Sequence, residues 1–279
     1  ETVILDPSLG VIPRRAGLPP VDRVLNSHCH EDHIAGSFLY PDTPWHFHTA
    51  DLHGIRSLDG LMELYGYPEP IYSIWKKTVV SQFHYTPRPD ALGFRDGYVF
   101  DLGGARVRVI HAPGHTRGHC LFHIEPDDLV YLADIDLSSF GPYYGDAWSD
   151  LDDFERTLEA VRKLDARWYA TFHHIGVLEG RAAYLERLDR FTAVIADRER
   201  RLLDFLAEPH LVHIGLDQLE ADLELIDVHH LAQRKLGRGD IAGLGVTAPV
   251  AESVKLLDIA EVEPGLTLHP GAEADVERA

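Results

Sequence analysis

The 279-residue sequence lacks the features that define several classes of protein. Its two cysteines are too few for a scaffold held by disulfides, and they rule out a four-cysteine zinc site. No segment approaches the roughly 18 consecutive apolar residues that a membrane-spanning helix needs. Basic side chains are also scarce, with 26 lysines and arginines against 45 acidic residues. The resulting net charge of −19 disfavours a protein that binds the phosphate backbone of a nucleic acid.

The overall composition is typical of a folded globular protein. Hydrophobic residues make up 45% and charged residues 25% of the chain, so enough apolar surface is available for a sizeable core. The length fits two average domains or one large α/β domain with extensions. No signal peptide is recognisable from Glu1 onward, which favours a cytoplasmic location, although a segment removed ahead of Glu1 would not be visible.

Hydrophobic patterning predicts an alternation of strands and helices. The expected strands cover residues 3–5, 21–27, 78–83, 98–102, 105–110, 120–124, 129–133 and 167–172. The expected helices cover residues 34–40, 150–164 and 180–206. Residues 41–75, rich in proline and aromatic residues, are expected to be an irregular insertion that shapes a pocket. Because hairpins exclude a purely parallel sheet, the expected fold class is α/β (α+β), a four-layer αββα sandwich of two mixed β-sheets with outer helices.

The densest group of polar residues directly follows the predicted strand at 21–27. In this segment His28, His30, Asp32 and His33 fall within six residues. Imidazole and carboxylate are the ligand groups that zinc and similar divalent cations use. At a turn from a strand to a helix, the first two histidines can face one metal centre while the aspartate and the third histidine face a second.

Three further polar groups also follow predicted strands. His115 lies in a glycine-flanked turn, Asp134 ends a short apolar run, and the pair His173 and His174 ends another. If these strands lie side by side, their ends meet at one edge and collect the four groups into a single site.

The motif order HxHxDH, then GHTxGH, then a strand-end aspartate and a strand-end histidine, resembles the metallo-β-lactamase superfamily. The similarity in motif order spans about residues 2–185, and the aspartate makes the sequence similar to the glyoxalase II and lactonase branches. The resemblance implies a first metal held by His28, His30 and His115, a second metal held by Asp32, His33 and one histidine of the 173–174 pair, and Asp134 as the bridge between them. Aligning residues 172–177 with the family's Gly-His-Gly gives His174 as the expected ligand and His173 as the alternative.

The resemblance also implies a metal-dependent hydrolase. Two divalent metal ions would supply a hydroxide that cleaves a small ester, thioester or lactone. Zinc is the first expectation for these ions, and iron and manganese are the alternatives. Asp32 would act as a catalytic residue that takes up a proton. Tyr143 and Tyr144 follow Asp134 closely enough to contact the substrate, where a hydroxyl could stabilise an oxyanion.

Other functions stay open at this point. A mononuclear iron persulfide (sulfur) dioxygenase shares the same motifs, and a phosphodiesterase or β-lactam hydrolase would have the same fold. A sensor with an idle metal site is a further alternative. The expected partner is a small-molecule substrate, with no nucleic acid and no membrane, and a homodimer is an option. Residues 1–206 are predicted to form the catalytic domain with the metallo-β-lactamase fold. Residues 207–279, which no motif covers, are predicted to form a mostly helical C-terminal extension.

Overall fold

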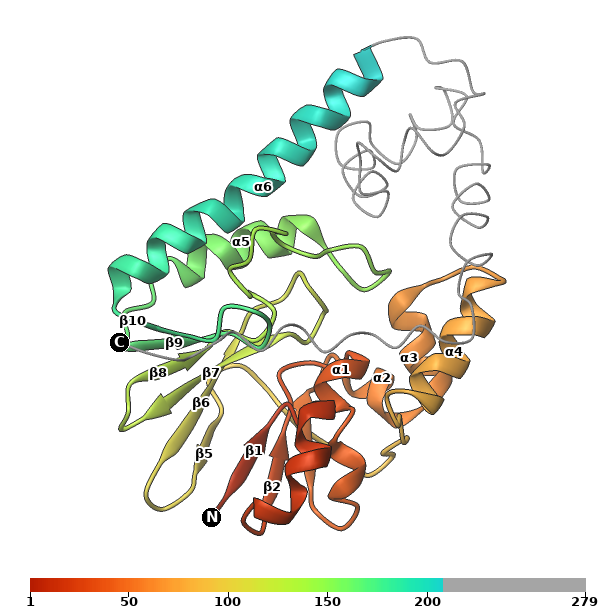
Figure 1. Ribbon diagram of the computed structural model, residues 1–279, viewed down its shortest axis with the longest axis vertical. Coiled ribbons are helices and arrows are strands. Elements are labelled where there is room, and N and C mark those ends of the chain that lie inside the picture. The colour runs from red at the N-terminus through yellow and green to blue at the C-terminus, as the bar shows by residue number, and fades with distance from the viewer. Residues whose placement is uncertain (208–279) are drawn as a thin grey trace, which may run out of the picture.

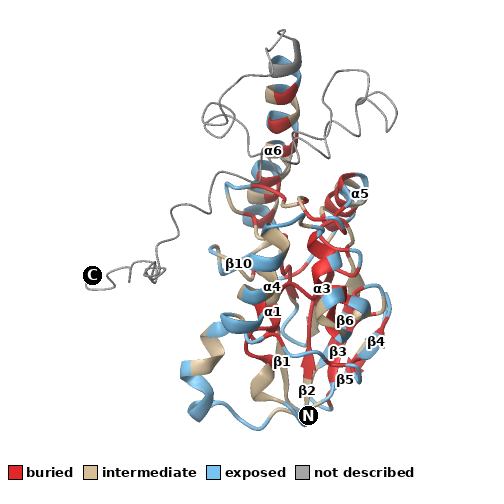
Figure 2. Ribbon diagram, turned by 90° about the vertical axis from the view of Figure 1, so that its right-hand side faces the viewer, coloured by how far each residue is buried: buried red, intermediate tan, exposed pale blue. Residues whose placement is uncertain are grey.

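The computed structural model of the protein describes residues 1–207, which form two β-sheets with helices on their outer sides (Figure 1). One apolar cluster lies between the sheets and includes Leu25 and Phe94 from the first sheet and Val109 and Phe122 from the second. A second cluster joins the first sheet to its helices, and a third joins the second sheet to its helices. Figure 2 shows buried stretches along the strands and along one side of the longest helix. The predicted four-layer αββα sandwich is confirmed.

The first sheet has the strand order β1-β2-β3-β4, and all of its strands run parallel. Its strands are β1 (Val3–Leu5), β2 (Arg23–Leu25), β3 (Trp45–His48) and β4 (Leu92–Phe94). Parallel neighbours need long crossover connections, and these contain two 3₁₀ helices (Leu9–Gly17 and Ser37–Leu39) and the helices α1 (Glu31–Ile34), α2 (Leu52–Arg56), α3 (Leu58–Tyr65) and α4 (Ile71–Ser81). This sheet is therefore wholly parallel, whereas the sequence predicted a mixed one.

The second sheet is mixed and has the order β10-β9-β8-β7-β6-β5. Its strands are β5 (Val99–Asp101), β6 (Arg106–His111), β7 (Cys120–Glu125), β8 (Leu129–Tyr131), β9 (Trp168–Ala170) and β10 (Val177–Glu179). β8 and β9 pair in parallel through a connection that contains α5 (Leu151–Val161), and the other neighbours pair antiparallel. Helix α6 (Arg181–Ala207) follows β10, and α5 and α6 lie along this side of the molecule (Figure 1).

Helix α5 confirms the helix predicted at 150–164. Asp150 caps it, since its side chain accepts a hydrogen bond from the backbone N–H of Asp153 at 2.8 Å. Phe154, Leu158 and Val161 recur at helical spacing and are buried in the core.

The strand predicted at 78–83 is wrong, because residues 78–81 are the last turn of helix α4. Tyr72, Trp75 and Val79 recur at helical spacing and pack against the core beside the first sheet. The β-branched residues Thr78 and Val79 favoured a strand locally, but burial of this helical face decides the structure. The insertion at 41–75 is also more regular than expected, since it contains a fully buried strand, β3, and most of the helices of this side.

The described helices include no span long and apolar enough to cross a membrane. The helical extension predicted for 207–279 lies, from residue 208 onward, outside the described residues.

Candidate metal centre

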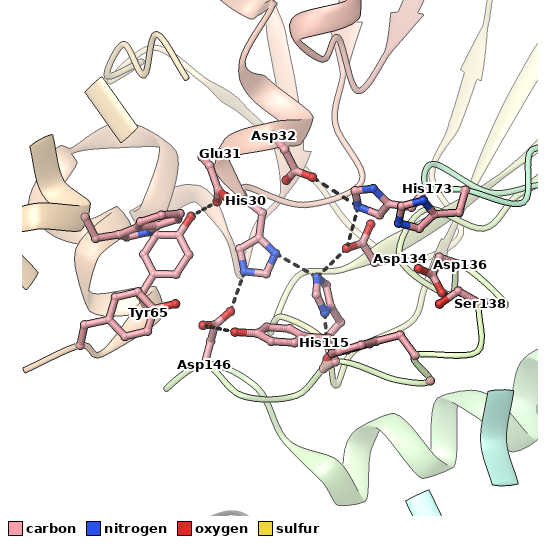
Figure 3. Close-up of a pocket in the computed structure, with 16 residues that line it drawn as sticks. His30, Glu31, Asp32, Tyr65, His115, Asp134, Asp136, Ser138, Asp146 and His173 are labelled. Carbon is pink, nitrogen blue, oxygen red and sulfur yellow. Dashed lines mark hydrogen bonds and ion pairs between the residues drawn. The ribbon is translucent and has the colours of Figure 1, made fainter. Parts of the chain in front are cut away.

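The polar groups singled out in the sequence converge in space (Figure 3). His28 and His30 follow β2, His115 follows β6, Asp134 follows β8, and His173 follows β9. The turn before His115 requires a glycine: Gly114 has a φ of +126°, and a Cβ atom there would lie 2.3 Å from the Cα atom of Phe154. The predicted convergence of strand ends is therefore present, and it brings together ligand groups from four separate segments.

The first cluster consists of His28, His30, His115 and Asp134. The Nδ1 atom of His30 lies 3.0 Å from Nε2 of His28 and 2.9 Å from Nε2 of His115. The Nε2 atoms of His28 and His115 are 3.2 Å apart, and the Oδ2 atom of Asp134 lies 3.1 Å from Nε2 of His115. All four side chains thus aim one atom at a common point.

This arrangement fits a bound cation. Three ring nitrogens that face one another cannot all be satisfied by hydrogen bonds, because a neutral imidazole has one N–H and one acceptor nitrogen. Metal–nitrogen bonds of about 2.0–2.1 Å in a tetrahedral site place neighbouring ligand atoms roughly 3.3 Å apart, close to the separations seen here. The donor set of three imidazoles and one carboxylate therefore matches a divalent transition metal such as zinc.

The second cluster consists of Asp32, His33 and His173, and Asp134 also reaches it. Nε2 of His33 lies 2.7 Å from Oδ1 of Asp134 and 3.8 Å from Oδ1 of Asp32. Nε2 of His173 lies 3.3 Å from Oδ2 of Asp32 and 3.7 Å from Oδ2 of Asp134. Nε2 of His33 and Oδ1 of Asp134 are both buried, and neither makes a well-directed hydrogen bond within the described chain. Two buried polar atoms without such a bond also fit a cation beside them.

The structure places His173 in this cluster, where the sequence led us to expect His174. Residues 171–176 form a tight turn in which the N–H of Ile175 donates to the carbonyl of His173 at 2.6 Å and the N–H of Thr171 donates to the carbonyl of Gly176 at 2.9 Å. Within this turn His174 has a φ of +47°, a left-handed conformation that redirects its side chain. His174 lines the pocket but is exposed, and it belongs to neither cluster.

Asp6 anchors the second cluster from behind and was missed in the sequence. Its Oδ2 atom lies 2.9 Å from Nδ1 of His33, accepts a hydrogen bond from Tyr131 at 2.7 Å and pairs with Ser27. Ser27 in turn lies 2.9 Å from Nδ1 of His28. Such partners fix the orientation and tautomer of a ligating histidine. A signal for Asp6 was present, because it directly follows the first strand, as the predicted ligands follow theirs.

Asp146 and Tyr143 hold the first cluster in a similar way. Oδ2 of Asp146 lies 2.9 Å from Nε2 of His30, and the backbone carbonyl of Tyr143 lies 2.9 Å from Nδ1 of His115. The hydroxyl of Tyr143 donates to Oδ1 of Asp146 at 3.2 Å. Both residues come from the loop after β8, which has no regular pattern, so the role of Asp146 had no signal in the sequence.

His119 supports Asp134 through the backbone. Its Nδ1 atom lies 2.9 Å from the carbonyl of Ala112, and its Nε2 atom accepts a hydrogen bond from the N–H of Asp134 at 3.3 Å. The second histidine of the GHTxGH motif is therefore explained as a structural support.

Burial and neighbouring charges set the ionisation of the clustered groups. Burial, together with the nearby charge of His33, lowers the pKa of His28 well below its usual value and keeps the imidazole in the neutral form that binds metals. Burial on its own would raise the pKa of Asp134, but the charges of His33, His115 and His28 outweigh it and lower that pKa well below its usual value. Metal binding needs the ionised carboxylate and neutral imidazoles. Burial on its own would lower the pKa of His30, but its hydrogen bond with Asp146 outweighs burial and raises that pKa to about 9, so a bound cation would displace a proton from this ring.

The clusters open into a pocket of about 440 Å³. His30, Asp32, His115, Asp134 and His173 all contribute to its lining. Of the two tyrosines expected to contact substrate, Tyr143 lines the pocket. Tyr144 does not, since its side chain is fully buried in the core.

A buried arginine of helix α6 holds the loop that carries Tyr143. Arg198 donates hydrogen bonds to the carbonyls of Pro142 at 2.6 Å and Phe140 at 2.7 Å, and its guanidinium lies 5.0 Å from the ring centre of Phe140. Gly141 packs so closely on the same helix that a Cβ atom would lie 2.5 Å from Cβ of Val194. Arg198 thus positions the loop whose carbonyl orients His115.

We expect Arg198→Met to weaken metal binding at the first cluster by about tenfold, because substitution of partners that orient metal ligands has effects of this order. Chelator competition would give the metal dissociation constants, and Arg198→Lys should restore part of the loss. Arg200→Met is the matched control, since Arg200 is exposed on the same helix and pairs with Asp197 and Asp204. Unchanged metal affinity in a folded Arg198→Met variant would contradict this role.

Comparisons with known proteins agree with the fold. The family model described as the metallo-beta-lactamase superfamily matches residues 1–174. A metallo-beta-lactamase family protein from Thermus thermophilus has a solved structure with a TM-score of 0.61 and 22% identity, covering 83% of this chain and 85% of that one.

Two sequence relatives cover smaller parts of the chain. An uncharacterized protein of Mycobacterium tuberculosis is 29% identical in an alignment of 150 positions that covers 48% of this chain and 62% of that protein. An atrochrysone carboxyl ACP thioesterase of Emericella nidulans is 26% identical over 167 residues, which are 60% of this chain and 45% of the thioesterase. The chain therefore spans less than two thirds of the length of these relatives. The family model matches more than half of the length of this chain. The chain therefore belongs to the metallo-β-lactamase superfamily.

Proposed function

We propose that the protein is a dinuclear metal-dependent hydrolase that cleaves a small ester, thioester or lactone, with a thioester as the favoured substrate. The observation that carries this proposal is that two ligand clusters share Asp134, whose two oxygens face different clusters, beside an open pocket. A shared carboxylate is the feature expected of a site that holds two cations close together.

His28, His30, His115 and Asp134 would hold the first cation, and Asp32, His33, His173 and Asp134 the second. Zinc suits this set of nitrogen and oxygen donors best, and iron and manganese also accept it. Bound there, two such cations would supply a hydroxide at neutral pH and would polarise a substrate carbonyl. The protein's own contribution is to orient the ligands through Asp6, Ser27 and Asp146, and to lower the pKa values of His28 and Asp134 well below their usual range.

Asp32 is the residue we assign to proton uptake. Its side chain lines the pocket and is partly exposed. Burial on its own would raise the pKa of Asp32. The nearby charge of His33 and a hydrogen bond from His173 outweigh burial and lower that pKa. The carboxylate is therefore ionised and able to accept a proton at the edge of the pocket nearest the second cluster.

The substrate we propose is a small molecule. A pocket of about 440 Å³ lies in the size range of small-molecule sites. The thioesterase name of a relative supports a thioester, and the net charge of −19 speaks against a nucleic acid.

The test combines metal analysis with a substrate panel. Purified protein should contain two divalent ions per chain, and it should hydrolyse at least one member of a panel of thioesters, esters and lactones. Removing the metals with a chelator should abolish the activity, and adding zinc, manganese or iron should restore it. One iron per chain with oxygen consumption on a persulfide would contradict the proposal, as would full metal loading without hydrolysis of any member.

A further inference from the structure

One wall of the pocket is an aromatic corner formed by Tyr65, which Figure 3 labels, together with Tyr67 and Trp75. The ring of Tyr65 is stacked between its neighbours, 5.7 Å from His30 at an interplanar angle of 15° and 5.4 Å from Tyr67 at 18°. Trp75 stands nearly perpendicular, with its ring 5.8 Å from Tyr65 and 6.2 Å from Tyr67. The corner therefore begins at a ligand of the first cluster, and the plane of Trp75 lies nearly at a right angle to the planes of Tyr65 and Tyr67.

The corner is held rigidly. The hydroxyl of Tyr65 donates a short hydrogen bond to Glu31, and Tyr65 is only 5% exposed. Tyr67 and Trp75 are half-buried and come from the segment after α3 and from helix α4, where they pack against the apolar cluster beside the first sheet. Rigid aromatic walls bind a ligand with little loss of side-chain entropy.

The pocket also has a one-sided charge. Five carboxylates line it, those of Glu31, Asp32, Asp134, Asp136 and Asp146, and among the described residues of the lining there is no lysine or arginine. Asp32 and Asp134 are the two that would ligate the proposed cations. A negatively charged group placed against the aromatic corner would lose its hydration beside Glu31 and Asp146 without a cationic side chain to compensate.

We propose that the substrate carries a flat, uncharged aromatic ring system that binds against Tyr65, Tyr67 and Trp75. This inference rests on the proposed hydrolase function, because it places the scissile carbonyl at the clusters and the ring in the adjoining corner. A planar ring can stack on one surface while it meets Trp75 edge to face, which is the favoured arrangement of aromatic pairs. A saturated ring of the same size would bury similar area without that contribution.

Binding of non-hydrolysable amides tests the ring preference separately from catalysis. On metal-loaded protein, 2-naphthamide should bind about three- to tenfold more tightly than decahydro-2-naphthamide by calorimetry. Trp75→Leu should bring this ratio close to one, and Tyr67→Leu should reduce it, while thermal unfolding reports that both variants are folded. Equal affinity of the wild-type protein for the two amides would overturn the proposal.

The charge preference needs a second comparison. 6-Carboxy-2-naphthamide should bind the wild-type protein at least tenfold more weakly than 2-naphthamide. Trp75→Arg should bind it at least tenfold more tightly than Trp75→Leu, because the two variants share the loss of the indole and differ in the added cation. Wild-type affinity for the carboxylated amide equal to that for 2-naphthamide would overturn the charge part of the inference.

Hydrolysis is then measured with thioesters carrying the same three acyl groups. If the amides follow the expected order but no thioester is cleaved, the proposed hydrolase function fails while the ring preference is retained. If thioesters are cleaved with equal kcat/KM for the aromatic and the saturated ring, the hydrolase function holds and the ring proposal fails.

Discussion

Replacing Asp134 with alanine is expected to remove both metal ions and to lower kcat/KM for hydrolysis by at least about 10³-fold. No other described side chain joins the two clusters in this way: its Oδ1 atom lies 2.7 Å from Nε2 of His33, and its Oδ2 atom lies 3.1 Å from Nε2 of His115. Its loss takes one ligand from each cation and also the negative charge that offsets two positive ions. Elemental analysis of the purified variant and steady-state kinetics on a thioester would measure the two effects.

Asp136→Ala is the matched control for this experiment. Asp136 also lines the pocket, two residues further along the chain, but it belongs to neither cluster and accepts a hydrogen bond from the N–H of Ser138 at 3.0 Å. Its removal should leave both metals in place and change kcat/KM by no more than about tenfold. If Asp134→Ala kept two metals per chain, the bridging role of this carboxylate would be refuted.

The candidate ligands were predictable because each of them follows a strand. A strand end can be read from a short apolar run, and side chains beyond such ends gather at one edge of a layered fold. This reasoning located His28, His30, His115 and Asp134, which the structure brings together. It would also have located Asp6, had the first strand been treated like the others.

Other parts of the structure depend on contacts that a local pattern does not contain. Asp146 reaches His30 from a loop more than a hundred residues away in sequence, and Arg198 reaches the same loop from helix α6. The segment 78–83 carries β-branched residues, and its helical state becomes clear only when Tyr72 and Trp75 are seen to pack on the same side as Val79. Long-range packing and hydrogen bonding therefore decide these features.

The turn after β9 shows how one backbone angle changes a ligand assignment. Motif alignment favoured His174 over His173, although the two histidines are adjacent and chemically identical. The positive φ of His174 and the hydrogen bonds within residues 171–176 direct the first histidine toward Asp32. Positive φ is uncommon outside glycine, and histidine is among the residues in which it is less rare, so the sequence carried no local sign of which histidine adopts it.

Replacing each of these two histidines with alanine, one at a time, is expected to give the second large difference in activity. His173→Ala is expected to lose the metal of the second cluster and to lower kcat/KM by about 10²- to 10³-fold, since a dinuclear site reduced to one cation loses part of its charge stabilisation. His174→Ala should retain two metals and stay within about threefold of wild-type activity, because this side chain is exposed at the rim of the pocket and in neither cluster. The pair is well matched, since both variants remove an imidazole from the same turn.

Metal titration separates a ligand role from a structural role in this turn. For His173→Ala, the first cation should still bind with near wild-type affinity, because His28, His30 and His115 lie in a different cluster, while the second should bind at least tenfold more weakly. A general disruption of the turn would instead lower the stability of both variants in thermal unfolding. The reverse outcome, with loss of the second metal in His174→Ala and retention in His173→Ala, would show that the turn rearranges when metal binds and that the motif alignment identified the ligand after all.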